Sequence, residues 1–189
     1  MKRSLIVRDV YDLSYFTEDE LATANAFKLQ KRVDEWLLAR FAAKQLALDL
    51  GIVDDPRACE VARPMLLVDG APVSWFVSIS HSAPYAAAAI DREPVGIDIQ
   101  VVRDLSENAA HLFLSDDEAE AMRRCTLPRR LLHFWCAKEA AWKPRSTELT
   151  TLKQLPIELL EERANGLRFD VAETTAMEDV ILGITVPTS

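Results

Sequence analysis

The sequence predicts an α+β protein, because helix-like and strand-like segments are gathered into alternate blocks along the chain. Apolar residues recur at helical spacing between about residues 28 and 50, and short apolar or alternating runs typical of strands follow in residues 65–99. A second helical block covers about residues 115–143, and strand-like runs return between residues 156 and 186. Each half of the chain therefore offers helices followed by strands.

Local signals support the predicted helices. Two segments have the capping-box spacing, in which a hydroxyl residue is followed three positions later by glutamate: Thr17 to Glu20 and Ser115 to Glu118. Gly51 is a suitable residue to end the long helix predicted for residues 28–50. Pro128 suits the first turn of a helix that would run to about residue 143, and Pro144 would stop it.

The segments that predict strands are shorter than those that predict helices, and they occur in both halves of the chain. Turn residues separate the expected strands, which cover residues 5–7, 65–68, 75–80, 86–90, 95–99, 156–160, 167–171 and 180–186. We expect an N-terminal half over residues 1–103, which contains the long helix, and a C-terminal half over residues 104–189.

Composition excludes several classes of protein. The 189 residues are 49% hydrophobic and 28% charged, which is a globular balance and excludes a mostly disordered chain. The net charge of −8 argues against a nucleic-acid partner. Three cysteines without short spacing argue against a disulfide framework and a zinc site. The N-terminal apolar run is broken at Arg8 and Asp9, so we expect a cytoplasmic protein with no membrane partner.

A strand with an acidic residue inside it is the first candidate for chemistry. In residues 95–100, Ile97 and Ile99 share one face and Asp98 and Gln100 share the other, because side chains alternate along a strand. A carboxylate within such an apolar strand is costly to bury unless it is paired. A metal ion, an arginine or exposure at a sheet edge would each satisfy Asp98.

Two further patterns lie on the predicted helices. Glu139 has Trp135 four residues before it and Lys143 four residues after it, which indicates a half-buried acid or a simple surface ion pair. On the long helix, residues spaced by four form a row that could hold a phosphate or could be only a solvated face: Lys28, Arg32, Trp36, Arg40 and Lys44.

Taken in order, these segments resemble the 4′-phosphopantetheinyl transferase superfamily, in its monomeric, two-half type named for activation of surfactin synthetase. The resemblance covers about residues 28–143 and rests on these motifs: Gly70-Ala71-Pro72, Ser80-His81-Ser82, Gly96-Ile97-Asp98-Ile99-Gln100, the stretch from His111 to Glu118, Trp135 through Lys138-Glu139 to Lys143, and the basic pair Arg32 and Arg40. It implies a pseudo-twofold fold of two similar halves, each with a small sheet and helices, that binds coenzyme A and Mg²⁺.

The resemblance also implies roles for individual residues. The expected metal ligands are Asp98, Gln100 and Glu139. The expected coenzyme A-binding residues are Arg32, Arg40, Ser80, His81, Lys138 and Lys143. The expected partners are coenzyme A and an acidic apo acyl or peptidyl carrier protein, and the expected state is a monomer.

The reaction implied is phosphoryl transfer, in which a carrier serine attacks the pyrophosphate of coenzyme A and 3′,5′-ADP leaves. Such chemistry depends on positioning and on neutralising charge, which assigns catalytic roles to Asp98, Glu139 and Lys143. Glu139, or a water that it polarises at the metal, could take the serine proton, and the sequence leaves both open.

Two departures from the family pattern leave alternatives. Gln100 stands where the family usually has a third metal carboxylate, and Ala71 stands where many members have lysine. One alternative is a Mg²⁺-dependent hydrolase of nucleotide pyrophosphates, in which water replaces the serine. Another is a degenerate module that binds coenzyme A without turning it over.

Overall fold

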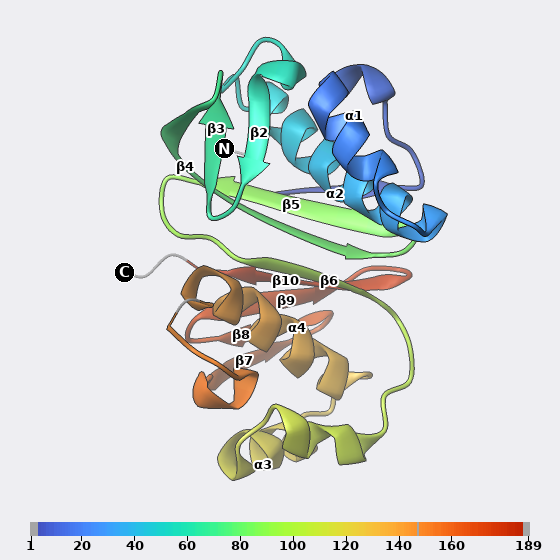
Figure 1. Cartoon of the computed structure of the whole chain (residues 1–189). Helices are drawn as coiled ribbons and strands as arrows, with labels where there is room; N and C mark the ends of the chain where they lie inside the picture. Colours follow the sequence, from blue (N-terminus) through green and yellow to red (C-terminus); the bar gives the residue numbers. More distant parts are fainter. Residues whose placement is uncertain (1–3, 147, 187–189) are drawn as a thin grey trace. The chain divides into compact units, whose positions relative to one another are not determined.

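The chain folds as two compact units that divide between Pro94 and Val95 in a computed structural model, which describes residues 4–146 and 148–186 (Figure 1). Each unit contains a five-stranded antiparallel sheet and helices, so the α+β prediction is confirmed. Within the described part of the chain, no helix combines the length and the apolar character needed to span a bilayer.

The first unit places two helices on a meandering sheet. Its helices are α1 (Glu18–Asn25) and α2 (Gln30–Asp49), with 3₁₀ turns η1 (Leu13–Tyr15) and η2 (Pro56–Ala58). Its strands are β1 (Ser4–Arg8), β2 (Cys59–Ala62), β3 (Met65–Val68), β4 (Ala71–Ser82) and β5 (Tyr85–Asp91), in the sheet order β1-β5-β4-β3-β2. The core of this unit includes Leu38, Ala42 and Leu46 of α2 and Ala88 and Ile90 of β5.

The second unit has the same kinds of element. Its helices are α3 (Asp116–Arg124) and α4 (Arg130–Trp142), with 3₁₀ turns η3 (Glu107–Leu112), η4 (Lys143–Arg145) and η5 (Leu152–Gln154). Its strands are β6 (Ile97–Val101), β7 (Leu159–Arg163), β8 (Gly166–Phe169), β9 (Ala172–Ala176) and β10 (Val180–Thr185), in the order β6-β10-β9-β8-β7. Phe134 of α4 packs edge-on against Phe169 of β8 in the core, with the ring centroids 4.9 Å apart.

The two units repeat one connectivity. In each, the first strand is followed by a short capped helix and a long helix, and the remaining four strands form a meander whose last strand pairs with the first: β5 with β1, and β10 with β6. The expectation of two similar halves is therefore met at the level of topology, although no repeat is visible in the sequence.

The boundary between the two units lies after Pro94, whereas the sequence predicted it after residue 103. Strand β6 pairs along its length with β10, for example Ile99 with Leu182, so residues 97–101 belong to the second sheet. This pairing joins segments about eighty residues apart, and no local pattern reveals such a partner. The Asp98 strand therefore belongs to the same unit as the Glu139 helix.

Both predicted capping boxes are present, at the starts of α1 and α3. Helix α4 begins at Arg130, two residues after the predicted position, because Arg129 adopts a left-handed conformation with φ +58°. Pro144 does not end the helical path at once, since the 3₁₀ turn η4 continues through it. The sequence signals missed β2 and β9, which are only four and five residues long.

A buried histidine in α4 makes the stability of the second unit depend on pH. His133 is fully buried, its Nδ1 lies 2.8 Å from the Thr174 hydroxyl, and its Nε2 has no hydrogen-bond partner among the described residues. Burial lowers the pKa of His133 from 6.5 to about 4, because the charged imidazolium would lose its hydration. The folded unit therefore keeps this histidine neutral at pH values where the unfolded chain protonates it.

We expect the second unit to lose stability as the pH falls below about 6.5, with the loss continuing towards pH 4. Between these values the unfolded state binds a proton that the folded state does not, which costs at most about 1.4 kcal/mol per pH unit and roughly 2 kcal/mol by pH 5. Urea titrations at pH 7.5 and 5 measure this. The control is His133→Gln, whose free energy of unfolding should change less over that interval, and equal slopes would contradict the assignment.

Candidate functional site

Strand β6 and helix α4 lie close enough together to bring the predicted acids into one place. Gly96 permits this approach, because a Cβ at that position would lie 1.8 Å from the carbonyl oxygen of Ala140 in α4. Gly183 of β10 plays the same part, since a Cβ there would lie 2.5 Å from the carbonyl oxygen of Cys136. The side chain of Asp98, in the buried first part of β6, therefore meets that of Lys143, which directly follows the last turn of α4.

Asp98 is the centre of this group, with only 3% of its surface exposed. Its Oδ1 lies 2.9 Å from the Nζ of Lys143, which also donates to the carbonyl oxygen of Ile97 at 2.6 Å. Its Oδ2 accepts a hydrogen bond from the Nε2 of Gln100 at 3.0 Å. Gln100 thus lies beside Asp98, as strand alternation predicts, and Lys143 supplies the positive charge that this buried carboxylate needs.

Glu139 is half-buried and shares the electrostatic environment of Asp98. Burial is the main cause that raises the pKa of Glu139, and the negative charge of Asp98 raises it further, while Lys143 acts in the opposite direction. Two carboxylates that repel each other in a partly buried place favour a cation between them. Their oxygens, with the Gln100 side-chain carbonyl as a neutral donor, are ligands of the kind that Mg²⁺ takes.

The donor set is poorer in charge than a three-carboxylate site. Among residues 4–146 and 148–186, no three His, Cys, Asp or Glu side chains come together as metal ligands would. Two acids and an amide nevertheless fit Mg²⁺, which commonly uses one or two carboxylates and completes its shell with phosphate oxygens and water.

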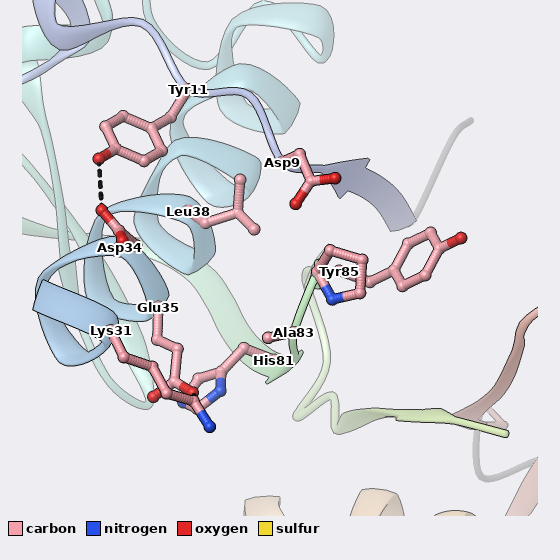
Figure 2. A pocket seen from close by; sticks show the side chains of 10 residues that line it. Asp9, Tyr11, Lys31, Asp34, Glu35, Leu38, His81, Ala83 and Tyr85 are labelled. Atoms are coloured by element: carbon pink, nitrogen blue, oxygen red, sulfur yellow. Dashed lines mark hydrogen bonds and ion pairs between the residues drawn. The ribbon is translucent and has the colours of Figure 1, made fainter. Parts of the chain in front are cut away.

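His81 lies in a pocket of the first unit. The pocket has a volume of about 500 Å³ and is formed by the end of β4, the β4–β5 turn, α2 and the segment after β1 (Figure 2). Its polar lining includes Tyr11, Lys31, Asp34, Glu35, His81 and Tyr85. The preceding residue, Ser80, is buried, because alternation along β4 turns the two side chains to opposite faces.

Lys31 is a residue of this pocket that the sequence analysis missed. Its ammonium lies 3.8 Å from Glu35, and Arg32 lies 3.4 Å from the other oxygen of the same carboxylate. The i,i+4 spacing of Lys31 and Glu35 was the available signal, but it is also typical of a surface pair. Lys31, Glu35 and His81 face the same pocket in Figure 2.

The basic row on α2 does not form one anion-binding cluster. Arg40 stacks on Trp36, with its guanidinium 3.7 Å from the ring centroid, and burial lowers the pKa of Arg40 to about 10. Arg32 is instead exposed beside Glu35, about 12 Å along the helix from Arg40. Lys44 is fully buried. Arg40 lines a second pocket of about 610 Å³ together with acidic residues, among them Glu20 and Glu60.

Comparison with known proteins decides the family. Residues 94–184 match the family model described as the 4'-phosphopantetheinyl transferase superfamily. Residues 94–184 therefore belong to the 4′-phosphopantetheinyl transferase superfamily. The resemblance expected from the motifs is confirmed.

Three relatives show how far the similarity extends. Enterobactin synthase component D of Salmonella typhi is 30% identical over 125 residues, which cover 64% of this chain and 51% of that protein. The protein of the same name from Escherichia coli (strain K12) is 31% identical over 122 residues, or 60% and 55% of the two chains. The 4'-phosphopantetheinyl transferase psf-1 of Bacillus pumilus is 33% identical over 70 residues, or 35% and 30%. The chain spans about half the length of the enterobactin synthase components that it matches.

The stretch matched to the 4′-phosphopantetheinyl transferase superfamily contains every residue of the cluster around Asp98, which is called the acid group below. Asp98, Gln100, Glu139 and Lys143 all fall within residues 94–184, whereas Arg32, Arg40, Ser80 and His81 precede them. The structural grouping and the family match thus coincide on the second unit.

Lys138, which the family resemblance assigns to coenzyme A binding, lies in the core of the second unit. Its side chain is fully buried, and its ammonium lies 2.7 Å from Glu118 and donates to the carbonyl oxygens of Leu152 and Leu155. Although Lys138 precedes Glu139, the two side chains leave the helix about 100° apart. Lys138 therefore binds protein groups within the core of its unit.

Proposed function

We propose that this chain transfers the 4′-phosphopantetheine group of coenzyme A to a serine of an apo carrier protein, with release of 3′,5′-ADP and with Mg²⁺ as cofactor. The observation that carries the proposal is the group formed by Asp98, Glu139 and Lys143 within the stretch that matches the transferase family. Two acids and one ammonium supply what phosphoryl transfer requires, namely a cation site and a positive charge for the phosphates.

Asp98, Glu139 and the Gln100 carbonyl would hold the Mg²⁺. When bound, the ion neutralises charge on the pyrophosphate of coenzyme A. The Nε2 of Gln100 now donates a hydrogen bond to Asp98, and Gln100 would give up this bond to turn its carbonyl oxygen towards the ion.

Lys143 and Glu139 have separate tasks in the proposed reaction. Lys143, whose side chain is 20% exposed, turns from Asp98 to a phosphate oxygen and balances the charge that develops there. Glu139, or a water that it polarises at the metal, takes the proton from the attacking serine.

We also propose that residues of the first unit bind coenzyme A. His81 and Lys31 line one pocket and offer an imidazole and an ammonium to a phosphate. Ser80, Arg32 and Arg40 stay proposed as coenzyme A-binding residues from the family resemblance, although Arg32 and Arg40 have different neighbours and so would contact different groups of the ligand.

We further propose an acidic acyl or peptidyl carrier protein as the partner, and a cytoplasmic monomer as the working form. The printed name of the Bacillus pumilus relative, 4'-phosphopantetheinyl transferase psf-1, supports the activity. The absence of any paired cysteine, with Cys59, Cys125 and Cys136 all buried and free, agrees with a reducing compartment.

Removing the ammonium from Asp98 should strengthen the binding of free Mg²⁺. In the Lys143→Met variant Asp98 loses its counter-charge, so a divalent ion becomes the better partner, and the dissociation constant for Mg²⁺ without coenzyme A should fall roughly tenfold. Calorimetric titration of the apo-protein measures this. Coenzyme A affinity should fall in the same variant, and unchanged Mg²⁺ affinity would show that Lys143 does not compete for this site.

Gln100→Glu is the companion variant. It adds a third carboxylate beside Asp98 without removing Lys143, so it should also tighten the binding of free Mg²⁺. If Gln100→Glu and the unchanged protein bind Mg²⁺ equally, Gln100 does not belong to the metal site.

The product formed with and without a carrier separates transfer from hydrolysis. With coenzyme A and Mg²⁺ alone, the proposed transferase should form no 3′,5′-ADP, and addition of apo carrier should start its formation. Release of 3′,5′-ADP without carrier would favour a hydrolase, and coenzyme A binding without product in either case would favour a binding module.

A further inference from the structure

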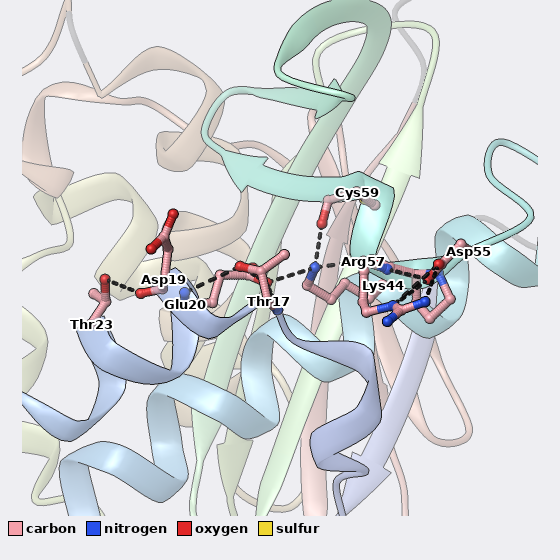
Figure 3. Close-up of polar contacts among 9 residues, drawn as sticks. Thr17, Asp19, Glu20, Thr23, Lys44, Asp55, Arg57 and Cys59 are labelled. Atoms are coloured by element: carbon pink, nitrogen blue, oxygen red, sulfur yellow. Dashed lines mark hydrogen bonds and ion pairs between the residues drawn. The ribbon is translucent and has the colours of Figure 1, made fainter.

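A buried lysine joins three segments of the first unit. Lys44 of α2 is fully buried, and its Nζ lies 3.0 Å from the Oε2 of Glu20, which is the capping-box glutamate of α1 (Figure 3). The same ammonium donates to the carbonyl oxygens of Pro56, at 3.0 Å, and Cys59, which lie at the two ends of the 3₁₀ turn η2. One side chain thus ties α1 and the η2 turn to α2.

The second unit contains the same arrangement. Lys138 of α4 is fully buried, and its Nζ lies 2.7 Å from the Oε2 of Glu118, which is the capping-box glutamate of α3. The ammonium donates to the carbonyl oxygens of Leu152, at 3.2 Å, and Leu155, at 2.6 Å, at the two ends of the 3₁₀ turn η5.

The two arrangements correspond part by part. In each unit the glutamate is the third residue of the short capped helix, the lysine is on the long helix, and the two carbonyl groups are three residues apart across a 3₁₀ turn that precedes the next strand. An ammonium has three N–H groups, and one carboxylate and two carbonyl oxygens use all of them. Each lysine is therefore fully satisfied by its own unit.

We propose that the chain carries one structural device twice, a buried ammonium clamp made of Lys44 with Glu20 and of Lys138 with Glu118. The clamp holds the capped helix and the 3₁₀ turn against the long helix in each unit. Lys138 has this structural role and does not bind coenzyme A. The statement that Lys138 does not bind coenzyme A rests on the proposed function. The structural role of the two clamps does not depend on that function.

The residue that follows the clamp lysine differs between the two units. Lys44 is followed by Gln45, which accepts a hydrogen bond from the hydroxyl of Tyr15, whereas Lys138 is followed by the acid Glu139. The first unit therefore repeats the clamp without the proposed catalytic acid. A feature present in both units belongs to the repeated fold, while the acid group belongs to the second unit alone.

Amine labelling of the unchanged protein tests the clamp without any variant. An acetylating reagent, with modification followed at each lysine by peptide mass spectrometry, should modify Lys44 and Lys138 at least about 100-fold more slowly than exposed Lys31, because reaction requires local opening. Coenzyme A should slow the modification of Lys143 and leave that of Lys138 unchanged. Modification of Lys138 as fast as that of Lys143, or protection of Lys138 by coenzyme A, would overturn the proposal.

Variants test the energetic role. Lys138→Met leaves the Glu118 carboxylate buried without its partner, so the unfolding equilibrium constant of the second unit should rise at least about 100-fold. Lys44→Met should do the same in the first unit. Hydrogen exchange in increasing urea, read from peptides of each unit, measures both.

A matched double variant completes the test. Glu118→Gln removes the uncompensated charge but keeps an acceptor for the backbone N–H of Ile157, so adding it to Lys138→Met should recover about tenfold of the loss. Unchanged stability in Lys138→Met, together with a weaker dissociation constant for coenzyme A, would instead make Lys138 a ligand residue. If coenzyme A does not bind the unchanged protein, the proposed function fails and the stability measurements still decide the clamp.

Discussion

Asp98→Asn should lower phosphopantetheine transfer by at least about a hundredfold. Asparagine keeps the size of the side chain but removes the charge that would hold Mg²⁺ and that now pairs with Lys143 at 2.9 Å. Steady-state transfer to an apo carrier, with radiolabelled coenzyme A, measures the loss. The pKa of Glu139 should also fall, because the charge of Asp98 is one of the causes that raise it.

Asp104→Asn is the matched control, because Asp104 is exposed and lies outside the acid group. It should transfer at the rate of the unchanged protein. Circular dichroism and urea titration establish that Asp98→Asn still folds. A folded Asp98→Asn protein that retains most of its activity would remove Asp98 from the proposed machinery.

Gly96→Ala should destabilise the second unit by about 3 kcal/mol or more and should nearly abolish transfer. The new Cβ would lie 1.8 Å from the carbonyl oxygen of Ala140, and a clash with backbone cannot be relieved by a side-chain rotation. Strand β6 and helix α4 must then separate, which moves Asp98 away from Glu139 and Lys143. Urea unfolding gives the free energy, and the transfer assay gives the activity.

Gly70→Ala distinguishes a close approach from backbone strain. Apart from its two chain neighbours, no described residue has an atom within 4 Å of a Cβ built at Gly70. The φ of +74° at Gly70 nevertheless disfavours alanine, so this variant should cost only about 1 kcal/mol in the first unit. If Gly96→Ala costs no more than Gly70→Ala, the contact between β6 and α4 is looser than the structure shows.

The sequence predicted local features well where the signal and its consequence lie in the same few residues. The capping boxes at Thr17 and Ser115 and the long helix ending near Gly51 are examples. The neighbourhood of Asp98 and Gln100 also follows from strand alternation alone. The motifs on either side of these residues then indicated the family.

Non-local pairing set the limits of prediction. The partner of β6 is a strand near the C-terminus, so the division of the chain fell at residue 94 and not at residue 103. The repeat of topology was invisible because it preserves the positions of elements and of the Lys44 and Lys138 clamps, while most surrounding residues differ.

Lys138 shows that the sequence does not reveal which groups a motif lysine contacts. In the order Lys138-Glu139, both residues look available to a charged ligand, and only the tertiary structure shows that Glu118 and two carbonyl groups already satisfy the lysine. The row on α2 is similar, since spacing by four placed Lys44 with Arg32 and Arg40 although Lys44 is buried. Burial of a long charged side chain depends on a partner elsewhere in the chain.

Intact mass spectrometry of apo carrier proteins tests the central claim most directly. Acyl and peptidyl carriers of several classes are incubated with coenzyme A, Mg²⁺ and the protein, and with Asp98→Asn as the inactive control. We expect at least one carrier to gain the mass of a single phosphopantetheine on its accepting serine, and to gain nothing with the variant or without Mg²⁺. No mass change in any carrier class, from a folded protein that binds coenzyme A, would contradict the assignment of this chain as a phosphopantetheinyl transferase.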